Sequence, residues 1–475
     1  MVVELKIPIT LGEVAFCCSK EVVDMYLYRE KGAEVADPVY KKKAGDARVI
    51  RRVVTDSREA MAGDLFVALR GKGGDGNEHL GEASARGAYT LSDTRGDADI
   101  FVKEVYSALG NIAALYKSLA SSLKKTVCIT GSVGKTTTKN FTTTMLSGHG
   151  RVCATKGNEN NLLGVPLTVL SLRPDTEYLV IEAGMNHFGE LSHISKTVCP
   201  DVAMITRIGT AHIGNFGDRK KIATAKLELF SHTSEGASLL IPYGEPLLSG
   251  RGPFSTVAVG YEPSADFSIA GGINGGGLSG EFYKGGDRIL SFSTEITARQ
   301  LLPSLGFALA ACYCAGIDPT EISALARRLS DTDTRIKVHR AGNVTVIDDA
   351  YNASRESVMG ALDYLTGFGE APKCALLGDI LELGALAEDI HYEIGKYAAR
   401  MLDMLFVCGD NREHLVRGAL AGGLSRERIM AIDGKCPEEI AREVATRLSS
   451  GILLIKGSHE TELYLVGEHL SRNGG

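Results

Sequence analysis

The stretch TVCITGSVGKTTTKNF, residues 126–141, decides the fold class of this 475-residue chain. An apolar, β-branched run is followed by Gly131 and Gly134, and Lys135 then opens a run of threonines. Glycines between a strand and a helix let backbone N–H groups turn toward phosphate oxygens, and the helix N-terminus adds positive potential. The usual phosphate loop has four residues between its glycines, and this loop has two. The stretch therefore predicts a nucleotide site built on a shortened loop.

Individual side chains of this loop have predicted contacts. Lys135 supplies a point charge for the β- and γ-phosphates of ATP, and the Thr136 hydroxyl is suited to Mg²⁺. The alternative is a chance G-K-T in a turn, which the strand before and the helix after disfavour. The predicted ATP contacts in the loop are Gly131, Ser132, Val133, Gly134, Lys135, Thr136 and Thr137.

Strand and helix alternate on both sides of the loop. An amphipathic helix over 105–119 precedes it, and the apolar runs after it predict further buried strands and helices. This order is typical of a parallel sheet with helices on both faces. The predicted elements downstream are strands at 177–184 and 202–209, a helix at 219–230, an antiparallel meander at about 262–295 and a buried helix at 302–316.

A second α/β series follows DTDTRIKVHRAGN, residues 331–343, which we interpret as a linker. Five strands and five helices predict a Rossmann-like domain, although no G-x-G-x-x-G opens it. The strands are VTVIDDA, CALLGDI, LFVCGD, RIMAID and GILLIKGS, and the helices lie near 355–366, 388–402, 411–421, 436–448 and 460–470. The predicted domains are a small mixed α/β domain at 1–103, a central domain at 104–334 and the Rossmann-like domain at 335–475.

Composition excludes several classes of protein. The formal net charge of −6 argues against a general nucleic-acid binder, whose footprint would be basic. The longest nearly apolar run, LGFALAACYCAG, is too short to span a bilayer, so no membrane insertion is expected. The first residues lack the layout of a signal peptide, and ten cysteines without C-x-x-C pairs suggest reduced thiols. We expect a cytoplasmic enzyme.

Three further residues stand where catalytic groups could lie. Glu182 ends the strand YLVIE, where an acid either binds Mg²⁺ beside a phosphate loop or caps a turn. His212 follows a strand in a glycine-rich loop, where a hydrogen-bonding surface histidine is the more common case. Lys226 lies on a predicted helix, where a solvated lysine is the ordinary expectation. Residue chemistry alone selects only Glu182.

Seven segments occur in the order seen in the Mur ligases, and the chain resembles that family over nearly its whole length. The N-terminal segment 55–88 also resembles the UDP-sugar domain of some members. The segments are TGSVGKTTTK, NENNLLGVPLTVL, IEAGMNHFGEL, RIGTAHIGNFG with AKLEL, VIDDAYNAS, LLGDILELG and IKGS.

The resemblance implies an ATP-dependent ligase that phosphorylates a carboxylate and lets an amine attack the acyl phosphate, giving an amide. It is closest to the members that add D-Ala-D-Ala to a UDP-MurNAc-tripeptide. We expect a monomer. The alternatives are a Mur-type ligase with another carboxylate and amine pair (MurE-like, pseudomurein or poly-γ-glutamate type), a phosphate-loop kinase or NTPase, and a silent scaffold.

The resemblance also assigns residues to roles. Thr136 and Glu182 match the ligands of a first Mg²⁺, and His212 with a carbamylated Lys226 matches those of a second. With Lys135, they form the implied catalytic set. Further matches are ATP contacts at Asn161, Arg335, Asp349 and Asn352, and UDP contacts at Ser57 and Arg58.

Three motifs depart from the family pattern. DAYNASRES has Ser354 and Arg355 where the family has Asn-Pro, and IKGSHET has His459 where arginine is usual. LLPSLGFALAA has Pro303 and Phe307 in place of a histidine and of an asparagine that contacts the nucleotide. These departures leave two possibilities open: harmless drift, or an altered acceptor or adenine site.

Overall fold

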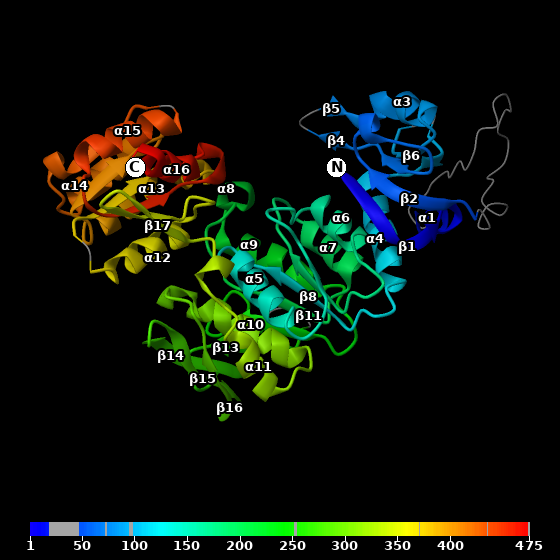
Figure 1. The fold of residues 1–475 in the computed structure, drawn as a ribbon, viewed down its shortest axis with the longest axis horizontal. Coiled ribbons are helices and arrows are strands. Elements are labelled where there is room, and N and C mark those ends of the chain that lie inside the picture. The colour runs from blue at the N-terminus through cyan, green and yellow to red at the C-terminus, as the bar shows by residue number, and fades with distance from the viewer. Residues whose placement is uncertain are drawn as a thin grey trace. The chain divides into compact units, whose positions relative to one another are not determined.

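The computed structural model describes residues 1–18, 47–71, 74–94, 98–250, 254–369, 371–434 and 436–473 (Figure 1). The chain forms two compact units, each described by itself. The first contains Met1–Ile129, Leu146–Ala203 and Glu228–Ser238; the second contains Thr130–Met145, Met204–Leu227 and Leu239–Gly475.

The N-terminal sheet of the first unit has both parallel and antiparallel strand pairs. Strand β1 pairs antiparallel with β2, and the remaining neighbours are parallel in the order β1-β2-β3-β6-β7. Buried apolar residues such as Val54 and Phe66 pack against helix α3. The elements are β1 (Val2–Thr10), α1 (Leu11–Cys18), β2 (Val49–Val54), β3 (Leu65–Val67), the pair β4 (Arg70–Gly71) and β5 (Gly74–Asp75), α3 (Leu80–Ala85), β6 (Tyr89–Ser92) and β7 (Ile100–Phe101).

The rest of the first unit holds three parallel strands in the order β9-β10-β8. Every residue of β10 is buried, as expected for a strand covered on both faces. The buried Tyr116 joins this part to β1, because its hydroxyl accepts from the N–H groups of Lys6 and Ile7, both at 2.9 Å. The elements are α4 (Val105–Ser118), β8 (Lys125–Thr130), β9 (Val152–Ala154), α6 (Gly164–Leu170), β10 (Tyr178–Glu182) and α7 (Glu190–Val198).

The second unit begins with the phosphate loop and the helix after it, and it includes the predicted meander. Strands β14, β15 and β16 are joined by two Gly-Gly turns with positive φ, which suits tight hairpins. The predicted buried helix is α10, which packs on β13 and β14. The elements are α5 (Lys135–Leu146), β11 (Val202–Ile205), α8 (Ile213–Phe216), α9 (Arg219–Leu227), β12 (Ser238–Pro242), β13 (Val257–Gly260), β14 (Phe267–Asn274), β15 (Gly277–Lys284), β16 (Asp287–Ser293), α10 (Leu302–Cys314) and α11 (Pro319–Ala326).

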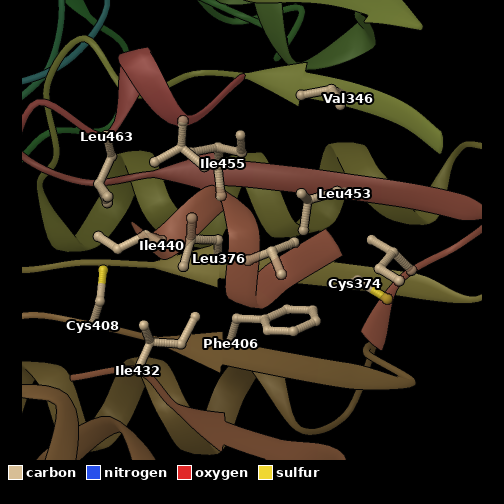
Figure 2. Packing of buried hydrophobic residues seen from close by; sticks show 14 of the residues in the cluster. Val346, Cys374, Leu376, Phe406, Cys408, Ile432, Ile440, Leu453, Ile455 and Leu463 are labelled. Atoms are coloured by element: carbon tan, nitrogen blue, oxygen red, sulfur yellow. The ribbon is translucent and has the colours of Figure 1, made fainter. Parts of the chain in front are cut away.

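The C-terminal sheet of this unit has six strands in the order β17-β18-β22-β19-β20-β21. Alternate strand residues face the cluster shown in Figure 2, where Ile440 of α15 meets Leu376, Phe406 and Leu453. The opposite alternation is also buried, so helices cover both faces. The elements are β17 (Lys337–Ala341), β18 (Val344–Asp348), α12 (Arg355–Thr366), β19 (Lys373–Leu377), α13 (Ala387–Ala398), β20 (Met404–Val407), α14 (Arg412–Ala421), β21 (Ile429–Ala431), α15 (Pro437–Arg447), β22 (Gly451–Lys456) and α16 (Tyr464–Asn473).

The interpretation of 331–343 as a linker is wrong in part. Residues 337–341 form β17, which pairs antiparallel with β18 from Ala341↔Val344 onward. The two residues between these strands are Gly342, with φ of 58°, and Asn343. A Gly-Asn pair between short strands is a hairpin signal, so the strand was predictable from its turn.

All ten cysteines carry free thiols, as the sequence suggested. Burial raises the pKa of Cys128 and Cys312 to about 12, so these thiols stay protonated and act as small apolar side chains. In the described part of the chain, every helix is too short or too polar to cross a bilayer.

Candidate functional site

The phosphate loop is shaped by the segment that follows β11. Ser132 donates its N–H to the Arg207 carbonyl at 2.8 Å, and the Thr206 hydroxyl donates to the Val133 carbonyl at 2.6 Å. Gly131 has φ of 151°, and a Cβ there would lie 1.9 Å from Thr206 Oγ1. Only glycine fits this approach, so the shortened loop is a built feature and not a chance turn.

A cavity opens beside this loop within the second unit. Its wall combines the loop with the start of α10, the segment around Arg335, the loop after β18 and the first turns of α12. The lining residues are Ser132, Val133, Gly134, Lys135, Thr136, Thr137, Arg207, Ala211, Gln300, Leu301, Ser304, Arg335, Ile336, Asp349, Tyr351, Asn352, Ala353, Ser354, Glu356, Ser357, Gly360, Ala361 and Lys456. Three residues assigned from distant motifs, Arg335, Asp349 and Asn352, therefore share one cavity with the loop.

Lys226 is not the solvated helix lysine that its sequence context suggested. It is 2% exposed, on the buried side of α9. Burial lowers the pKa of its amine well below the ordinary 10.5, and the positive charge of Lys135 lowers it further. Lys135 itself donates from Nζ to the Gly131 carbonyl at 2.7 Å. The structure thus places a buried amine, with a tendency to be neutral, close to the phosphate-loop lysine.

His212 is held in a left-handed conformation, with φ of 62°, at the start of α8. Its Nδ1 contacts the carboxylate of Glu382, a residue that is also left-handed. The Gly214 N–H donates to the Glu382 carbonyl at 2.8 Å, and a Cβ on Gly214 would lie 2.6 Å from that oxygen. A carboxylate on one imidazole nitrogen orients the other nitrogen for a metal, so the arrangement suits a ligand histidine.

The loop that carries Glu382 is braced by a buried histidine, His391. Its Nε2 accepts from the Ile380 N–H at 3.0 Å, and its Nδ1 lies 2.6 Å from the Ala387 carbonyl. Burial lowers the pKa of His391 below the ordinary 6.5. The unfolded chain therefore binds a proton near pH 6.5 that the folded chain resists.

We expect the free energy of unfolding to fall as the pH drops below 6.5 and through the folded pKa of His391. In His391→Gln this part of the stability loss at low pH should disappear. The urea midpoints of the variant at pH 7 and pH 5 should therefore differ less than those of the parent. The exposed His187→Gln is the matched control and should keep the parent's acid loss. An equal acid loss in His391→Gln would contradict the assignment.

Lys456, at the end of β22, is a site residue that the sequence analysis missed. Its side chain is 2% exposed and donates to the carbonyls of Asp349 and Asn352 at 2.9 and 2.8 Å. It also pairs with the Asp349 carboxylate at 2.9 Å. The buried Lys456 side chain thus holds the backbone and one side chain of residues 349–352, the D-A-Y-N loop, which lines the cavity.

His459, one of the departures, lies between two aromatic rings, tilted on one and stacked on the other. The Arg335 guanidinium lies 3.9 Å from the ring centroid of Tyr351, and the His459 ring lies 5.0 Å from that of Tyr351. On its other contact, His459 stacks on Tyr464 at 5.3 Å and 17°. Such contacts are typical of guanidinium and aromatic planes. The histidine supports Tyr351 at the cavity wall.

The Ser354-Arg355 departure preserves the start of α12. Ser354 is the N-cap residue, and its hydroxyl and that of Ser357 exchange hydrogen bonds with each other's backbone N–H. Asparagine and serine are both favoured N-caps, and the next position tolerates proline because its N–H has no helical partner. The arginine instead pairs with Glu393 at 2.7 Å. The local fold is therefore kept at this departure.

Ser354→Ala should cost about 1 kcal/mol of unfolding free energy, because an N-cap acceptor is lost. Ser354→Asn, which restores the family residue, should stay within a few tenths of a kcal/mol of the parent. Chemical denaturation of the three proteins measures this. Equal losses in both variants would rule out capping as the role of this side chain.

The first unit holds the remaining predicted residues. Glu182 is buried and accepts from Asn160 Nδ2 at 2.8 Å, and the Asn161 side chain accepts from the Gly164 N–H at the start of α6. Ser57 donates to Glu82 at 2.7 Å. Arg58 is paired with Asp56, which keeps the pKa of that carboxyl low. The predicted shared cation of Glu182 and Thr136, and the UDP contacts, stay predictions.

Among the described residues, no group of three or more His, Cys, Asp or Glu side chains forms a ready-made metal site. The predicted donors are of another kind: a threonine hydroxyl, single acidic and imidazole groups and a lysine. Hard cations such as Mg²⁺ commonly take few protein ligands and complete their shell with substrate phosphates and water. The donor set suits Mg²⁺ brought with a nucleotide.

Comparisons with known proteins place these features in one family. The model of the Mur ligase middle domain matches residues 129–270, and that of the Mur ligase, glutamate ligase domain, matches residues 334–459. The UDP-N-acetylmuramoyl-tripeptide–D-alanyl-D-alanine ligase of Bacillus subtilis (strain 168) is 30% identical over 442 residues, which are 90% of this chain and 94% of that protein.

Solved structures agree. MurF from Acinetobacter baumannii is similar with a TM-score of 0.84 and 25% identity, over 99% of this chain and 100% of that chain. MurF from Thermotoga maritima, solved in complex with ADP, has a TM-score of 0.76 and 28% identity, over 88% of this chain and 97% of that chain. The predicted three-domain α/β architecture is confirmed.

Proposed function

Because this chain belongs to the Mur ligase family, we infer that it is an ATP-dependent amide ligase of peptidoglycan precursor synthesis. The observation that carries this function is the cavity that joins a shortened phosphate loop to the D-A-Y-N loop of a Rossmann-like domain. A kinase or switch protein needs only the phosphate loop and has no need of a second domain at the nucleotide. The named relatives act on UDP-MurNAc-tripeptide and D-Ala-D-Ala, and we propose these substrates for this chain.

The reaction needs charge neutralisation and positioning more than a protein nucleophile. A carboxylate oxygen of the peptide attacks the γ-phosphorus, and the bond to the β-phosphate oxygen breaks, giving an acyl phosphate and ADP. The amine lone pair then forms the C–N bond, phosphate leaves with its oxygen, and the amine proton passes to solvent. Lys135 and the loop N–H groups stabilise the phosphate charge, while Lys456 holds the D-A-Y-N loop in place.

We propose Thr136 and Glu182 as ligands of one Mg²⁺, and His212 with a carbamylated Lys226 as ligands of a second. Bound Mg²⁺ supplies charge neutralisation at the phosphates. Two observations support the second set. Glu382 contacts His212 and orients its ring. Burial of Lys226 favours its neutral amine, the form that reacts with CO₂. A carbamate turns this amine into a carboxylate-like ligand, which suits a hard cation.

We further propose a UDP-sugar domain at 1–103 with Ser57 and Arg58 as substrate contacts, a central ATP domain at 104–334 with Asn161 as a nucleotide contact, and a closing domain at 335–475. A cytoplasmic monomer fits these substrates, which are soluble nucleotides and small peptides. Closure over the nucleotide would exclude water that hydrolyses the acyl phosphate.

The test is incubation with ATP, Mg²⁺, UDP-MurNAc-tripeptide carrying ¹⁸O in its terminal carboxylate, and D-Ala-D-Ala. We expect phosphate release that requires both the tripeptide and D-Ala-D-Ala. One ¹⁸O atom should pass from the tripeptide carboxylate to the released phosphate. The mass of the peptide product should exceed that of the tripeptide substrate by the mass of D-Ala-D-Ala minus water. Release with another amine only would identify a different Mur-type ligase. Release without any amine would indicate a kinase or NTPase, and no release with any acceptor would indicate a scaffold.

A further inference from the structure

Two polar side chains at the start of α10 line the nucleotide cavity, and no motif assigns them a role. Gln300 lies in the 3-10 helix η5 (Arg299–Leu301), and Ser304 lies one turn later in α10. Ser304 is 9% exposed, and its Oγ lies 3.3 Å from the position that a Cβ on Gly134 would occupy. Its hydroxyl therefore lies against the phosphate loop.

The amide nitrogen of Gln300, Nε2, is buried and has no hydrogen-bond partner among the described residues, although the residue as a whole is half-buried. A buried NH₂ group with no acceptor costs free energy, and native proteins rarely keep one unless a ligand or water pairs with it. This amide belongs to the cavity wall. The unpaired donor thus points to a ligand that carries an acceptor there.

The residues at the departing motif positions cannot supply this contact. Phe307 is 3% exposed in the apolar core, and Pro303 is exposed in the first turn of α10. Neither belongs to the described lining of the cavity. The polar groups that α10 and η5 present to the nucleotide cavity are therefore Gln300 and Ser304.

We propose that Ser304 contacts the phosphates and that Gln300 reads the adenine of ATP, which makes Gln300 a specificity-determining residue. This inference rests on the proposed function. Ser304 adjoins the phosphate loop, and Gln300, four residues earlier, lies about 6 Å away along the helix axis in the wall of the same cavity. A carboxamide both donates and accepts, which matches the N6–H donor and N7 acceptor of adenine. Guanine presents two acceptors, O6 and N7, on the same edge and matches it less well.

Gln300 is the sole glutamine of the chain, so ¹⁵N-glutamine labelling gives a single side-chain amide in the NMR spectrum. We expect Mg²⁺ and the non-hydrolysable analogue AMP-PNP to shift this signal and protect its protons from exchange. Imidodiphosphate, which lacks the nucleoside, should leave it nearly unchanged. If calorimetry shows AMP-PNP bound while the amide signal does not move, the inference is wrong and the proposed function stands.

Gln300→Ala should weaken AMP-PNP binding roughly tenfold or more and reduce the preference for ATP over GTP by a similar factor. The KM for ATP should rise by that factor, while kcat stays within about twofold, because the phosphates keep their contacts. Pro303→Ala, an exposed change one turn away, is the matched control and should bind AMP-PNP like the parent. Equal affinity and equal nucleotide preference in Gln300→Ala would overturn the inference. Failure of the parent itself to bind AMP-PNP would overturn the proposed function too.

Discussion

Replacing Lys456 with methionine is expected to lower the free energy of unfolding by about 3 kcal/mol and to abolish measurable ATP binding. The change leaves the Asp349 carboxylate, which is 19% exposed on its side chain, without its cation, and it releases two carbonyl oxygens. Removing one partner of a buried pair costs about 3–5 kcal/mol, and the partial exposure of Asp349 favours the lower end. Denaturant unfolding and calorimetry with AMP-PNP measure the two effects.

The matched control is Lys396→Met, which makes the same change at an exposed position of α13 and should leave both properties intact. Asp349→Asn in the Lys456→Met background should recover part of the stability, because the unpaired charge is removed. ATP binding should not recover with it, because the backbone contacts to Lys456 stay broken. If Lys456→Met bound AMP-PNP like the parent, this lysine would have no part in ordering the D-A-Y-N loop.

Lys456 also shows what the sequence could have revealed. GILLIK is an uninterrupted apolar run that ends in lysine, and all six residues of this strand are buried. A strand covered on both faces gives its last side chain little access to solvent, so a charged residue there needs a partner. The signal for a buried functional cation was therefore present in the printed sequence.

The phosphate loop, the alternating strands and the D-A-Y-N loop were predictable because their chemistry is local. Glycines at fixed spacing and apolar runs of strand length depend on near neighbours along the chain. The part of the cavity wall formed by Gln300 was not predictable, since it depends on whether η5, the turn before α10, reaches the cavity. No spacing rule reports that, and a single glutamine before a buried helix carries no pattern of its own.

Lys226 is a second case in which tertiary packing overrides the local pattern. RKKIATAKL has four basic residues and a weak apolar face, which is typical of a solvated helix. Three of its basic residues are exposed, and Lys226 alone is buried, with Ile222, Ala223 and Ala225. Only the structure separates this lysine from its neighbours Lys220 and Lys221.

Replacing Lys226 with methionine is expected to lower kcat by about 10²–10³-fold, as the loss of one charge-stabilising group at a phosphoryl-transfer site does. The free energy of unfolding should stay unchanged or rise. Methionine fills a similar volume without the cost of burying an amine. That cost is present below the unfolded pKa of 10.5, because the unfolded chain gains a proton there that the buried amine resists. Lower activity with equal or higher stability separates a functional role from a structural one.

The control variants are Lys220→Met and Lys221→Met on the exposed side of the same helix, which should keep parental turnover. The chemistry of Lys226 is tested with ¹³C-bicarbonate, which should give the parent, and not Lys226→Met, a carbamate carbon signal. Removing CO₂ from the buffer should slow the parent reversibly, whereas added bicarbonate should not rescue the variant. If turnover of Lys226→Met were near normal, the assignment of Lys226 to the catalytic site would be wrong. A slow variant combined with a parent indifferent to CO₂ would instead assign the role to the free amine.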